Sequence, residues 1–397
     1  MQPIVCVGDV HEGIGFGIRV DPDTGISERA LDLHRNFVTA AKWAIDNHSA
    51  LFCVLGDMFD RSHVAPTFRE MVRRDIIEPL GKAGIEVWLL AGNHDQPRSF
   101  NRATSLDDYR GYAHVKVIRR PCLMEKEIGG KRIAFIVMPY LHPDQVVELA
   151  REKLGKDVPP EEVFETAKGI WREWVKNRAA DSKADWVILF GHFEVEGAQY
   201  SSITTREVMP GDTAFGRDLV PPQVNLAVFG HIHKHQVLWD RLVYAGAPER
   251  IDWGERLDDK GFVVLHPEDK SWEFVKLPVR EMLKINVAVD ASDDPTAKIL
   301  ASLPRDVAAK MFRIEVSIPE TMRGRVDERM ISDRLKDSFS YEFRWTAPEK
   351  EKIVAEEFTL DPVRLLRDFI SQQYREHPRR TEILEEGERF LKGVLEK

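Results

Sequence analysis

Short, almost uninterrupted apolar runs recur along the chain, and each ends at a glycine. Five of these runs cover residues 4–7, 51–55, 85–91, 187–190 and 226–229. Runs of this length that are rich in Val, Ile, Leu and Phe and stop at Gly are typical of strands buried on both faces of an α/β sheet. The pattern therefore predicts a layered α/β fold with these five strands at its centre.

Apolar residues recur at helical spacing between these runs. The spacing predicts amphipathic helices over residues 27–48 and 67–82, and a more charged helix over 157–178 with Trp171 and Trp174 on its core face. Packing of the first two helices onto the sheet and packing against a second copy of the chain both agree with the pattern.

The pattern changes after Pro278. Strands and helices are predicted in alternation over residues 284–290, 295–303, 311–318, 327–337 and 341–345. This arrangement predicts a small α+β domain over residues 279–347, after a first domain over residues 1–278.

A charged stretch then predicts a linker over residues 348–360. Apolar stripes over residues 361–376 and 380–396 predict a helical pair within a last segment, residues 361–397. Either a partner helix or the chain's own domains would cover these stripes, and we favour a partner.

Length, charge and cysteine content narrow the class of protein only slightly. A chain of 397 residues exceeds the usual size of one core, so more than one domain is expected. The formal charge of -9 argues against a generally basic coat for nucleic acid, although a metal-filled groove would still attract phosphate. Three cysteines beside or within apolar runs suit reduced thiols in a cytoplasmic protein. With no signal-like N-terminus and no apolar run of membrane-spanning length, we expect a soluble protein that is not exported.

Side chains that can bind metals follow the glycine of every apolar run. They are Asp9, His11, Asp57, Asn93, His94, Asp95, His192, His231 and His233. Any one of the acidic or amide residues could be an ordinary turn former. Because functional groups gather at the carboxyl ends of strands in α/β sheets, the ordered set instead predicts one shared site.

The residue types in this set indicate which metals it would bind. Apart from His94 and Asp95, the set contains seven residues that offer carboxylate, amide and imidazole ligands without thiolate. Such ligands suit manganese, iron or zinc rather than calcium. Seven ligands are too many for one ion, so we expect two ions about 3.5 to 4 Å apart, bridged by Asp57. Such a pair suits in-line displacement at phosphorus. In extended backbone, alternation would direct His231, His233 and His235 to the same side and Ile232 into the core.

Taken in order, the motifs resemble those of the calcineurin-like metallophosphoesterases. They read Asp9-x-His11, Gly56-Asp57, Gly92-Asn93-His94-Asp95, Gly191-His192 and Gly230-His231-x-His233. The segments 244–255 and 260–264 further resemble the SbcD-type DNA double-strand-break repair nucleases of the meiotic-recombination-eleven family. The resemblance covers residues 1 to about 278. It implies a layered α/β metallophosphoesterase sandwich, followed by a small capping domain and a C-terminal helical pair.

The resemblance also implies a role for each motif residue. One divalent ion, expected to be manganese, would be held by Asp9, His11, Asp57 and His233. The other would be held by Asp57, Asn93, His192 and His231. His94 would act catalytically on the scissile phosphate, and Asp95 is expected to orient it.

Activities and partners follow from the same resemblance. It implies a 3'-to-5' exonuclease on duplex DNA ends and an endonuclease on single strands or hairpins. It also implies a homodimer, and a coiled-coil ATPase of the SbcC type, related to ABC and SMC proteins, bound by the C-terminal helices. The alternative enzyme is a calcineurin-like phosphatase or phosphodiesterase that acts on a small substrate. A scaffold with an inactive site is disfavoured because the ligand set is intact.

Four residues near the motifs have open roles. Relatives commonly have Leu in place of Glu12, and His235 also departs from them. We expect His235 to be a solvated imidazole or a hydrogen-bond partner of a ligand. Asp60 and His63 would either contact DNA or serve as loop and capping residues.

Overall fold

The computed structural model describes residues 2–16, 19–99, 101–142, 144–145, 147–148, 159, 162–201, 214–348, 366, 370 and 380–395. The chain divides into two compact units. The first comprises Met1–Leu283, Ala308–Phe312 and Asp337–Tyr341, and the second comprises Lys284–Val307, Arg313–Lys336 and Glu342–Lys397. The predicted domain boundaries stay predictions. The predicted linker and nearly all of the predicted helix over 361–376 lie outside the described residues.

One sheet of the first unit contains the first three apolar runs. Its strands are β1 (Ile4–Val7), β2 (Leu51–Leu55), β3 (Glu86–Leu90), β4 (Val115–Ile118), β11 (Gly261–His266) and β12 (Ser271–Lys276). Their order is β12-β11-β1-β2-β3-β4, and β1 to β4 run parallel.

A second sheet contains the other two apolar runs. Its strands are β5 (Cys122–Ile128), β6 (Lys131–Met138), β7 (Trp186–His192), β8 (Leu226–Gly230), β9 (Gln236–Leu238) and β10 (Leu242–Tyr244). They lie in the order β5-β6-β7-β8-β10-β9, with β6, β7, β8 and β10 parallel. All five runs are thus confirmed as strands, three in one sheet and two in the other.

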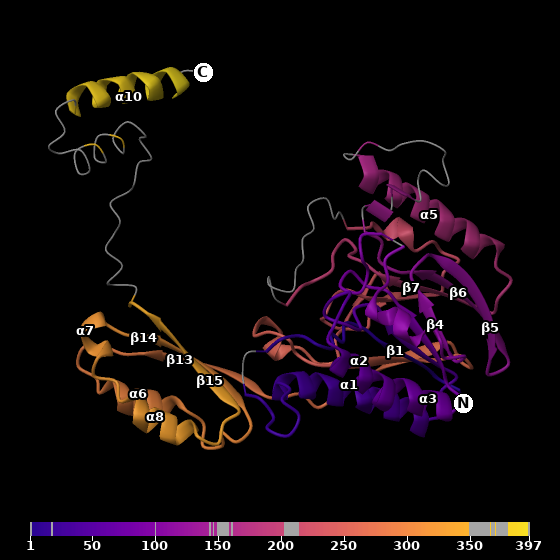
Figure 1. Ribbon diagram of the computed structural model, residues 1–397, viewed down its shortest axis with the longest axis horizontal. Coiled ribbons are helices and arrows are strands. Elements are labelled where there is room, and N and C mark those ends of the chain that lie inside the picture. Colours follow the sequence, from indigo (N-terminus) through magenta and orange to yellow (C-terminus); the bar gives the residue numbers. More distant parts are fainter. Residues whose placement is uncertain are drawn as a thin grey trace. The chain divides into compact units, whose positions relative to one another are not determined.

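The strands lack polar alternation because both of their faces are buried. Along β1, Val5 and Val7 pack among the residues that α1 (Glu28–Asp46) covers, whereas Ile4 and Cys6 pack between the two sheets. The outer face of the second sheet packs against α5 (Val163–Asp181). Figure 1 shows α5 on one side of the sheets and α1 to α3 on the other. Helix, sheet, sheet and helix therefore form four layers, which confirms the predicted layered sandwich.

The helix predicted over residues 67–82 is interrupted. It consists of α2 (Pro66–Val72), a π-helical segment (Arg73–Ile77) and α3 (Glu78–Lys82). Pro79 has no N–H to donate, and in a regular helix its ring would clash with the carbonyl group four residues earlier. The wider π turn before Pro79 relieves this clash while the helix continues.

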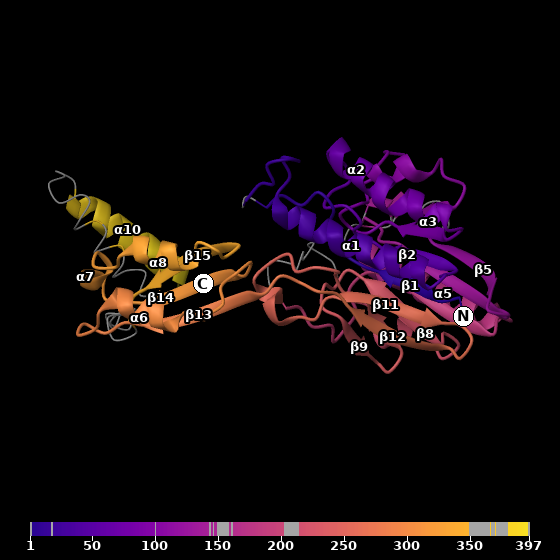
Figure 2. The same cartoon turned by 90° about the horizontal axis from the view of Figure 1, so that it is seen from below.

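The second unit contains most of the predicted alternation of strands and helices, and each of its three described strands begins with two residues of the first unit. Its elements include β13 (Met282–Ala288), α6 (Pro295–Ser302), β14 (Met311–Ser317), α7 (Glu320–Arg323), α8 (Glu328–Leu335), β15 (Ser340–Thr346) and α10 (Arg380–Leu395). The strand order is β13-β14-β15. Ile314 of β14, Ile299 of α6 and Ile331 of α8 are all fully buried. Both views place α6 and α8 along one face of this sheet (Figures 1 and 2).

No helix within the described part of the chain is both long and apolar enough to span a bilayer.

Candidate metal centre

The carboxyl ends of strands from both sheets meet at one cluster of polar side chains. Asp57 follows β2 and Asn93 follows β3 of the first sheet, whereas His192 ends β7 and His231 follows β8 of the second. His192 Nε2 lies 3.2 Å from Asp57 Oδ2, and His231 Nδ1 lies 3.0 Å from Asn93 Oδ1. Residues from motifs far apart in the sequence therefore share one site.

The first group in this cluster consists of Asp9, His11 and His233. Each offers one ligand atom, and these atoms all lie within 4.8 Å of one another. His11 Nε2 and His233 Nε2 are 3.1 Å apart. Two imidazoles that bind one ion through bonds of about 2.0 to 2.1 Å have nitrogens separated by roughly 3 Å, so this spacing fits a shared ion.

The second group consists of Asn93, His192 and His231. Asn93 Oδ1 lies 2.9 Å from His192 Nε2 and 3.0 Å from His231 Nδ1. His192 Nδ1 lies 2.7 Å from the carbonyl oxygen of Leu55, which can only accept a hydrogen bond. Nδ1 therefore carries a proton, and Nε2 is the nitrogen that faces the cluster.

Asp57 lies between the two groups. Its Oδ2 is 3.2 Å from His192 Nε2 and 4.0 Å from His11 Nε2. Its Oδ1 accepts a hydrogen bond from the backbone N–H of His94 at 2.9 Å. This placement between the two groups is what the predicted bridge between two ions requires.

Asp9 provides the clearest test of whether the cluster fits a cation. Its Oδ1 accepts a hydrogen bond from the backbone N–H of His231, whereas its buried Oδ2 has no hydrogen-bond partner in the described part of the chain. A buried carboxylate oxygen without a partner is unfavourable, and a bound cation would remove that penalty. The donor set of carboxylates, one amide and imidazoles fits manganese, iron or zinc.

The backbone at this centre is held in an unusual conformation. Asp9, His11, Asp57 and His231 have φ angles of 52°, 54°, 51° and 88°, in the left-handed region that residues other than glycine rarely adopt. Such conformations cluster at functional sites, where the surrounding structure holds them in place.

The charges in the cluster depend on its histidines. Burial alone would raise the pKa of Asp57, but the adjacent His192 and His94 imidazoles hold it well below its usual range. Burial opposes the charge of His192, yet Asp57 outweighs burial and raises the pKa of His192 to about 9. Burial and the nearby His192 lower the pKa of His231 to about 3. Without bound ions, His231 is therefore neutral and His192 is protonated at neutral pH, so a cation bound by His192 would displace its Nε2 proton.

His94 lies beside the first group. Its ring meets that of His11 edge to face, with the ring centroids 4.6 Å apart. Its Nδ1 lies 2.7 Å from the carbonyl oxygen of Asp60. Because that oxygen accepts the Nδ1 proton, Nε2 is the nitrogen that gains or loses a proton.

The expectation that Asp95 orients His94 is wrong. The Asp95 carboxylate instead accepts hydrogen bonds from the backbone N–H groups of Met58, Phe59 and Gly92. Two of these donors, Met58 and Phe59, belong to the loop that follows β2, so the buried carboxylate holds that loop by hydrogen bonds. Asp95 therefore fixes the loop that carries Asp57, and the backbone of Asp60 orients His94.

The expectation that alternation directs His235 toward the site is also wrong. Its ring stacks on Phe274 of β12 with the centroids 3.8 Å apart, and its Nδ1 lies 2.8 Å from the carbonyl oxygen of Tyr244. Ile232 is buried in the core and His231 and His233 face the cluster, as expected, but residues 231–235 do not form a regular strand and His235 departs from the alternation. Two further residues with open roles follow β2. Asp60 contributes to the site through its carbonyl oxygen, which contacts His94 Nδ1. His63 Nδ1 lies 3.1 Å from Ser62 Oγ in an exposed contact.

The sequence did not predict that two buried charged side chains, Glu255 and Lys260, lie beside His233. Glu255 Oε1 lies 2.8 Å from His233 Nδ1, and Glu255 Oε2 lies 2.8 Å from the fully buried Lys260 Nζ. Lys260 also donates a hydrogen bond to the carbonyl oxygen of His233 at 3.0 Å. Burial opposes ionisation of Glu255, but Lys260 and His233 outweigh burial and hold its pKa well below the usual range. Glu255 therefore fixes the ring of His233 with Nε2 directed at His11.

We expect Glu255→Gln to weaken manganese binding about 10- to 100-fold, because it removes the charge that orients a ligand imidazole. Isothermal titration calorimetry would measure this affinity. Glu273→Gln is the matched control, since Glu273 pairs with His266 at 3.1 Å on the β11–β12 hairpin, outside the centre. Equal affinities in the two variants would contradict a positioning role for Glu255.

Glu12 is also buried. Its Oε1 lies 2.8 Å from Nδ1 of His34 on α1, and His34 Nε2 lies 3.0 Å from Asp75 Oδ2 in the π-helical segment. Glu12 therefore has a polar partner on the helix that covers it.

We expect Glu12→Leu to lower the free energy of unfolding by about 1 to 3 kcal/mol, because it removes the partner of a buried imidazole nitrogen. The double variant Glu12→Leu/His34→Leu should recover part of this loss. Urea unfolding would measure both changes. A double variant less stable than Glu12→Leu alone would show that the two side chains do not act as a pair.

Comparisons with known proteins agree with this geometry. The family model described as calcineurin-like phosphoesterase matches residues 2–235. The DNA double-strand break repair protein Mre11 of Archaeoglobus fulgidus is 24% identical over 298 residues, which cover 70% of this chain and 61% of that protein. Its namesake in Aeropyrum pernix is 23% identical over 300 residues, covering 73% and 64% of the two chains.

A bacterial relative matches a shorter region. The SbcD component of the nuclease SbcCD from Escherichia coli is 23% identical over 212 residues, which cover 51% of each chain. The chain thus spans between about half and two thirds of the length of these curated relatives. The family model covers more than half of this chain and includes every residue of the cluster described above except Glu255 and Lys260. The chain therefore belongs to the calcineurin-like phosphoesterase family.

Proposed function

We propose that this protein is a two-metal nuclease that processes DNA ends at double-strand breaks. The observation that carries the proposal is the pairing of two ligand groups around one carboxylate, Asp57. Asp9, His11, Asp57 and His233 would hold one divalent ion, and Asp57, Asn93, His192 and His231 would hold the other. When bound, the two ions would supply Lewis-acid stabilisation of charge on the phosphoryl group and would make a water molecule more acidic.

The chain's own residues would position the substrate and move protons. His94, oriented by the Asp60 carbonyl, would protonate the leaving 3'-oxygen through Nε2. Asp95 would keep the Asp57 loop in place, and Glu255 would keep His233 in place. We propose manganese as the native ion, since the donor set suits it and contains no thiolate.

Two observations favour DNA over a small phosphoester. The relatives at 23 to 24% identity are named as a DNA repair protein and a nuclease. The chain also continues well beyond the region that the family model matches, into a separate compact unit. A phosphatase or phosphodiesterase for small substrates would use the same ligands without needing that unit. We propose 3'-to-5' exonuclease activity on duplex ends and endonuclease activity on single strands and hairpins.

We also propose partners for this activity. α1 and the α2–α3 helix would pair with a second copy of the chain, which would bring two centres to one DNA end. The C-terminal helices, including α10, would bind the coiled-coil base of an SbcC-type ATPase related to ABC and SMC proteins. The protein would then act on the nucleoid in the cytoplasm.

Cleavage of labelled DNA would test the proposal. Purified protein would be incubated with end-labelled duplex and hairpin DNA, and separately with bis-p-nitrophenyl phosphate, in the presence of manganese, magnesium or a chelator. We expect manganese-dependent degradation of the DNA. If the small ester is hydrolysed while both DNA substrates stay intact, the protein is a phosphodiesterase for small substrates and the nuclease proposal is wrong.

A further inference from the structure

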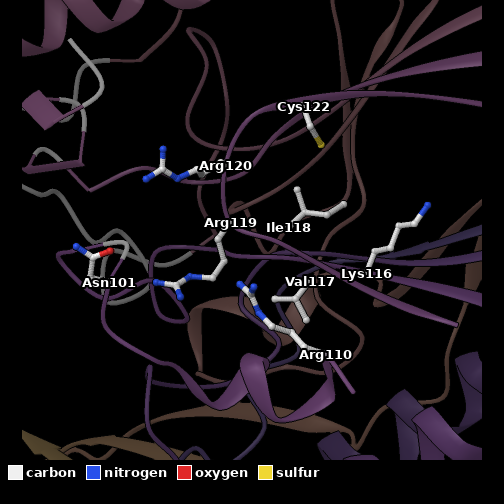
Figure 3. A pocket seen from close by; sticks show the side chains of 8 residues that line it. All are labelled: Asn101, Arg110, Lys116, Val117, Ile118, Arg119, Arg120 and Cys122. Atoms are coloured by element: carbon white, nitrogen blue, oxygen red, sulfur yellow. The ribbon is translucent and has the colours of Figure 1, made fainter. Parts of the chain in front are cut away.

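A basic pocket of about 610 Å³ lies where β4 ends and β5 begins (Figure 3). Arg110, Lys116, Arg119, Arg120 and Asn101 line it, together with apolar side chains and one cysteine, and no acidic residue of the described chain is among its lining. Figure 3 shows the guanidinium groups of Arg110, Arg119 and Arg120 with the amide of Asn101 on one side of the pocket, and Lys116 extending away from them. The pocket therefore presents a concentration of hydrogen-bond donors and positive charge.

Arg119 is the fixed element of this pocket. It is only 8% exposed, and its Nε donates a hydrogen bond to Gln96 Oε1 at 3.0 Å while its Nη1 donates to Asp107 Oδ2 at 3.1 Å. Its buried Nη2 has no hydrogen-bond partner in the described part of the chain. A buried donor of this kind is rare in native structures and requires a reason. The Arg119 side chain lines the pocket, and a guanidinium group is a suitable partner for an anion with several acceptor oxygens.

The acidic neighbours do not neutralise the three guanidinium groups. Arg110 and Arg119 share one carboxylate, Asp107, at 2.6 Å and 3.1 Å. Arg120 pairs with Glu148 at 3.8 Å. Arg110 and Arg119 thus share a single carboxylate, and planar guanidinium groups match the geometry of phosphate oxygens.

The pocket is linked to the metal centre by one residue. β3 and β4 are adjacent parallel strands, so the loop after β3 and Arg119 after β4 lie at the same edge of the sheet. The backbone N–H of Gln96 donates to the carbonyl oxygen of Gly92 at 3.1 Å, and its side-chain amide donates to the carbonyl oxygen of Arg119 at 3.1 Å. Neighbouring strands are about 4.8 Å apart, so the pocket lies next to the loop that carries Asn93 and His94.

We propose that this pocket binds a phosphate group of the polynucleotide strand other than the one that is cleaved. The inference rests on the proposed nuclease function, because a substrate with a single phosphate at the metal centre has no second phosphate to place here. The contact is to the backbone, so it adds affinity without adding base preference.

The test compares two charge-matched double variants of the full chain with manganese present. Arg110→Gln/Arg120→Gln alters two exposed members of the pocket and leaves Arg119 and the metal centre unchanged. Arg172→Gln/Lys176→Gln removes two charges from α5, outside the pocket. For each, KM for a single-stranded oligonucleotide is measured at several salt concentrations, alongside turnover of bis-p-nitrophenyl phosphate and calorimetric binding of inorganic phosphate.

The pocket variant should raise KM for the oligonucleotide and reduce the slope of log KM against log salt by about one. Its turnover of the small ester should match that of the wild type, and the α5 variant should match the wild type in every measurement. Equal KM values and slopes for the two variants would overturn the assignment. Loss of inorganic phosphate binding with an unchanged KM for DNA would identify a free-phosphate site instead, which also overturns it. A wild-type protein that hydrolyses the ester but not DNA would reject the nuclease proposal, and this inference with it.

Discussion

Replacing His94 with Ala should lower kcat on DNA by about 10²- to 10⁴-fold while manganese binding is retained. Turnover of bis-p-nitrophenyl phosphate should fall much less, because its nitrophenolate group leaves without needing a proton. The reason is that His94 is proposed to provide a proton for the leaving oxygen without holding a metal ion. Its Nδ1 is held by the Asp60 carbonyl oxygen, and its ring packs against that of His11. Steady-state kinetics and calorimetric titration with manganese would measure the two properties separately.

His266→Ala is a suitable control for this variant. His266 lies on β11 and pairs with Glu273, outside the metal centre. We expect its kinetics to match those of the wild type. Loss of manganese binding in His94→Ala would contradict the proposed role and assign His94 to the ligand set, whereas unchanged turnover of DNA would remove it from the reaction altogether.

Replacing Gly92 with Ala should abolish most of the activity by displacing Asp57. A Cβ atom at position 92 would lie 2.1 Å from Asp57 Oδ1 and 2.4 Å from the Asp57 backbone nitrogen, distances that real contacts do not reach. The chain must shift to relieve this overlap, at a cost of about 1 to 3 kcal/mol in the free energy of unfolding. A displacement of about 1 Å at a catalytic centre lowers turnover by roughly 100-fold.

Thermal unfolding, manganese titration and ester turnover would together test the Gly92 variant. Gly111→Ala is the matched control, because a Cβ at position 111 meets no atom within 4 Å. We expect Gly111→Ala to retain the affinity and turnover of the wild type. Full activity in Gly92→Ala would show that the position of Asp57 does not limit catalysis.

The same close approach explains a pattern visible in the sequence. Glycine precedes Asp57, Asn93, His192 and His231, and at Gly56 an added Cβ would lie 2.0 Å from His192 Nδ1. The glycines at these strand ends therefore allow segments of both sheets to approach one another. This is why glycine followed by a metal-capable residue was an informative motif.

Local patterns in the sequence were sufficient to predict the buried strands and the gathering of the motif residues. The continuous apolar runs reflect burial on both faces, and the ordered motifs follow strand ends that converge. The division of these strands between two sheets could not be predicted in this way, because it depends on pairings such as Ile188 with Leu226, which are distant in sequence.

The residues that support the metal ligands could not be predicted from the sequence for the same reason. Glu255 is 22 positions from His233, and nothing local distinguishes it from other acidic residues of the chain. Adjacency in the sequence predicts that Asp95 orients His94, but the Asp95 carboxylate instead accepts hydrogen bonds from the backbone of Met58, Phe59 and Gly92. Position 235 departs from strand alternation because Phe274 provides a stacking surface and the Tyr244 carbonyl oxygen accepts a hydrogen bond from its ring.

The number and position of bound ions would distinguish a two-metal centre from a site for a single ion. Crystals grown with manganese would be measured at the manganese absorption edge, where anomalous scattering locates each ion. We expect two peaks about 3.5 to 4 Å apart with Asp57 between them, one beside His11 and His233 and the other beside Asn93, His192 and His231. A single peak, or peaks outside this cluster, would contradict a two-metal centre.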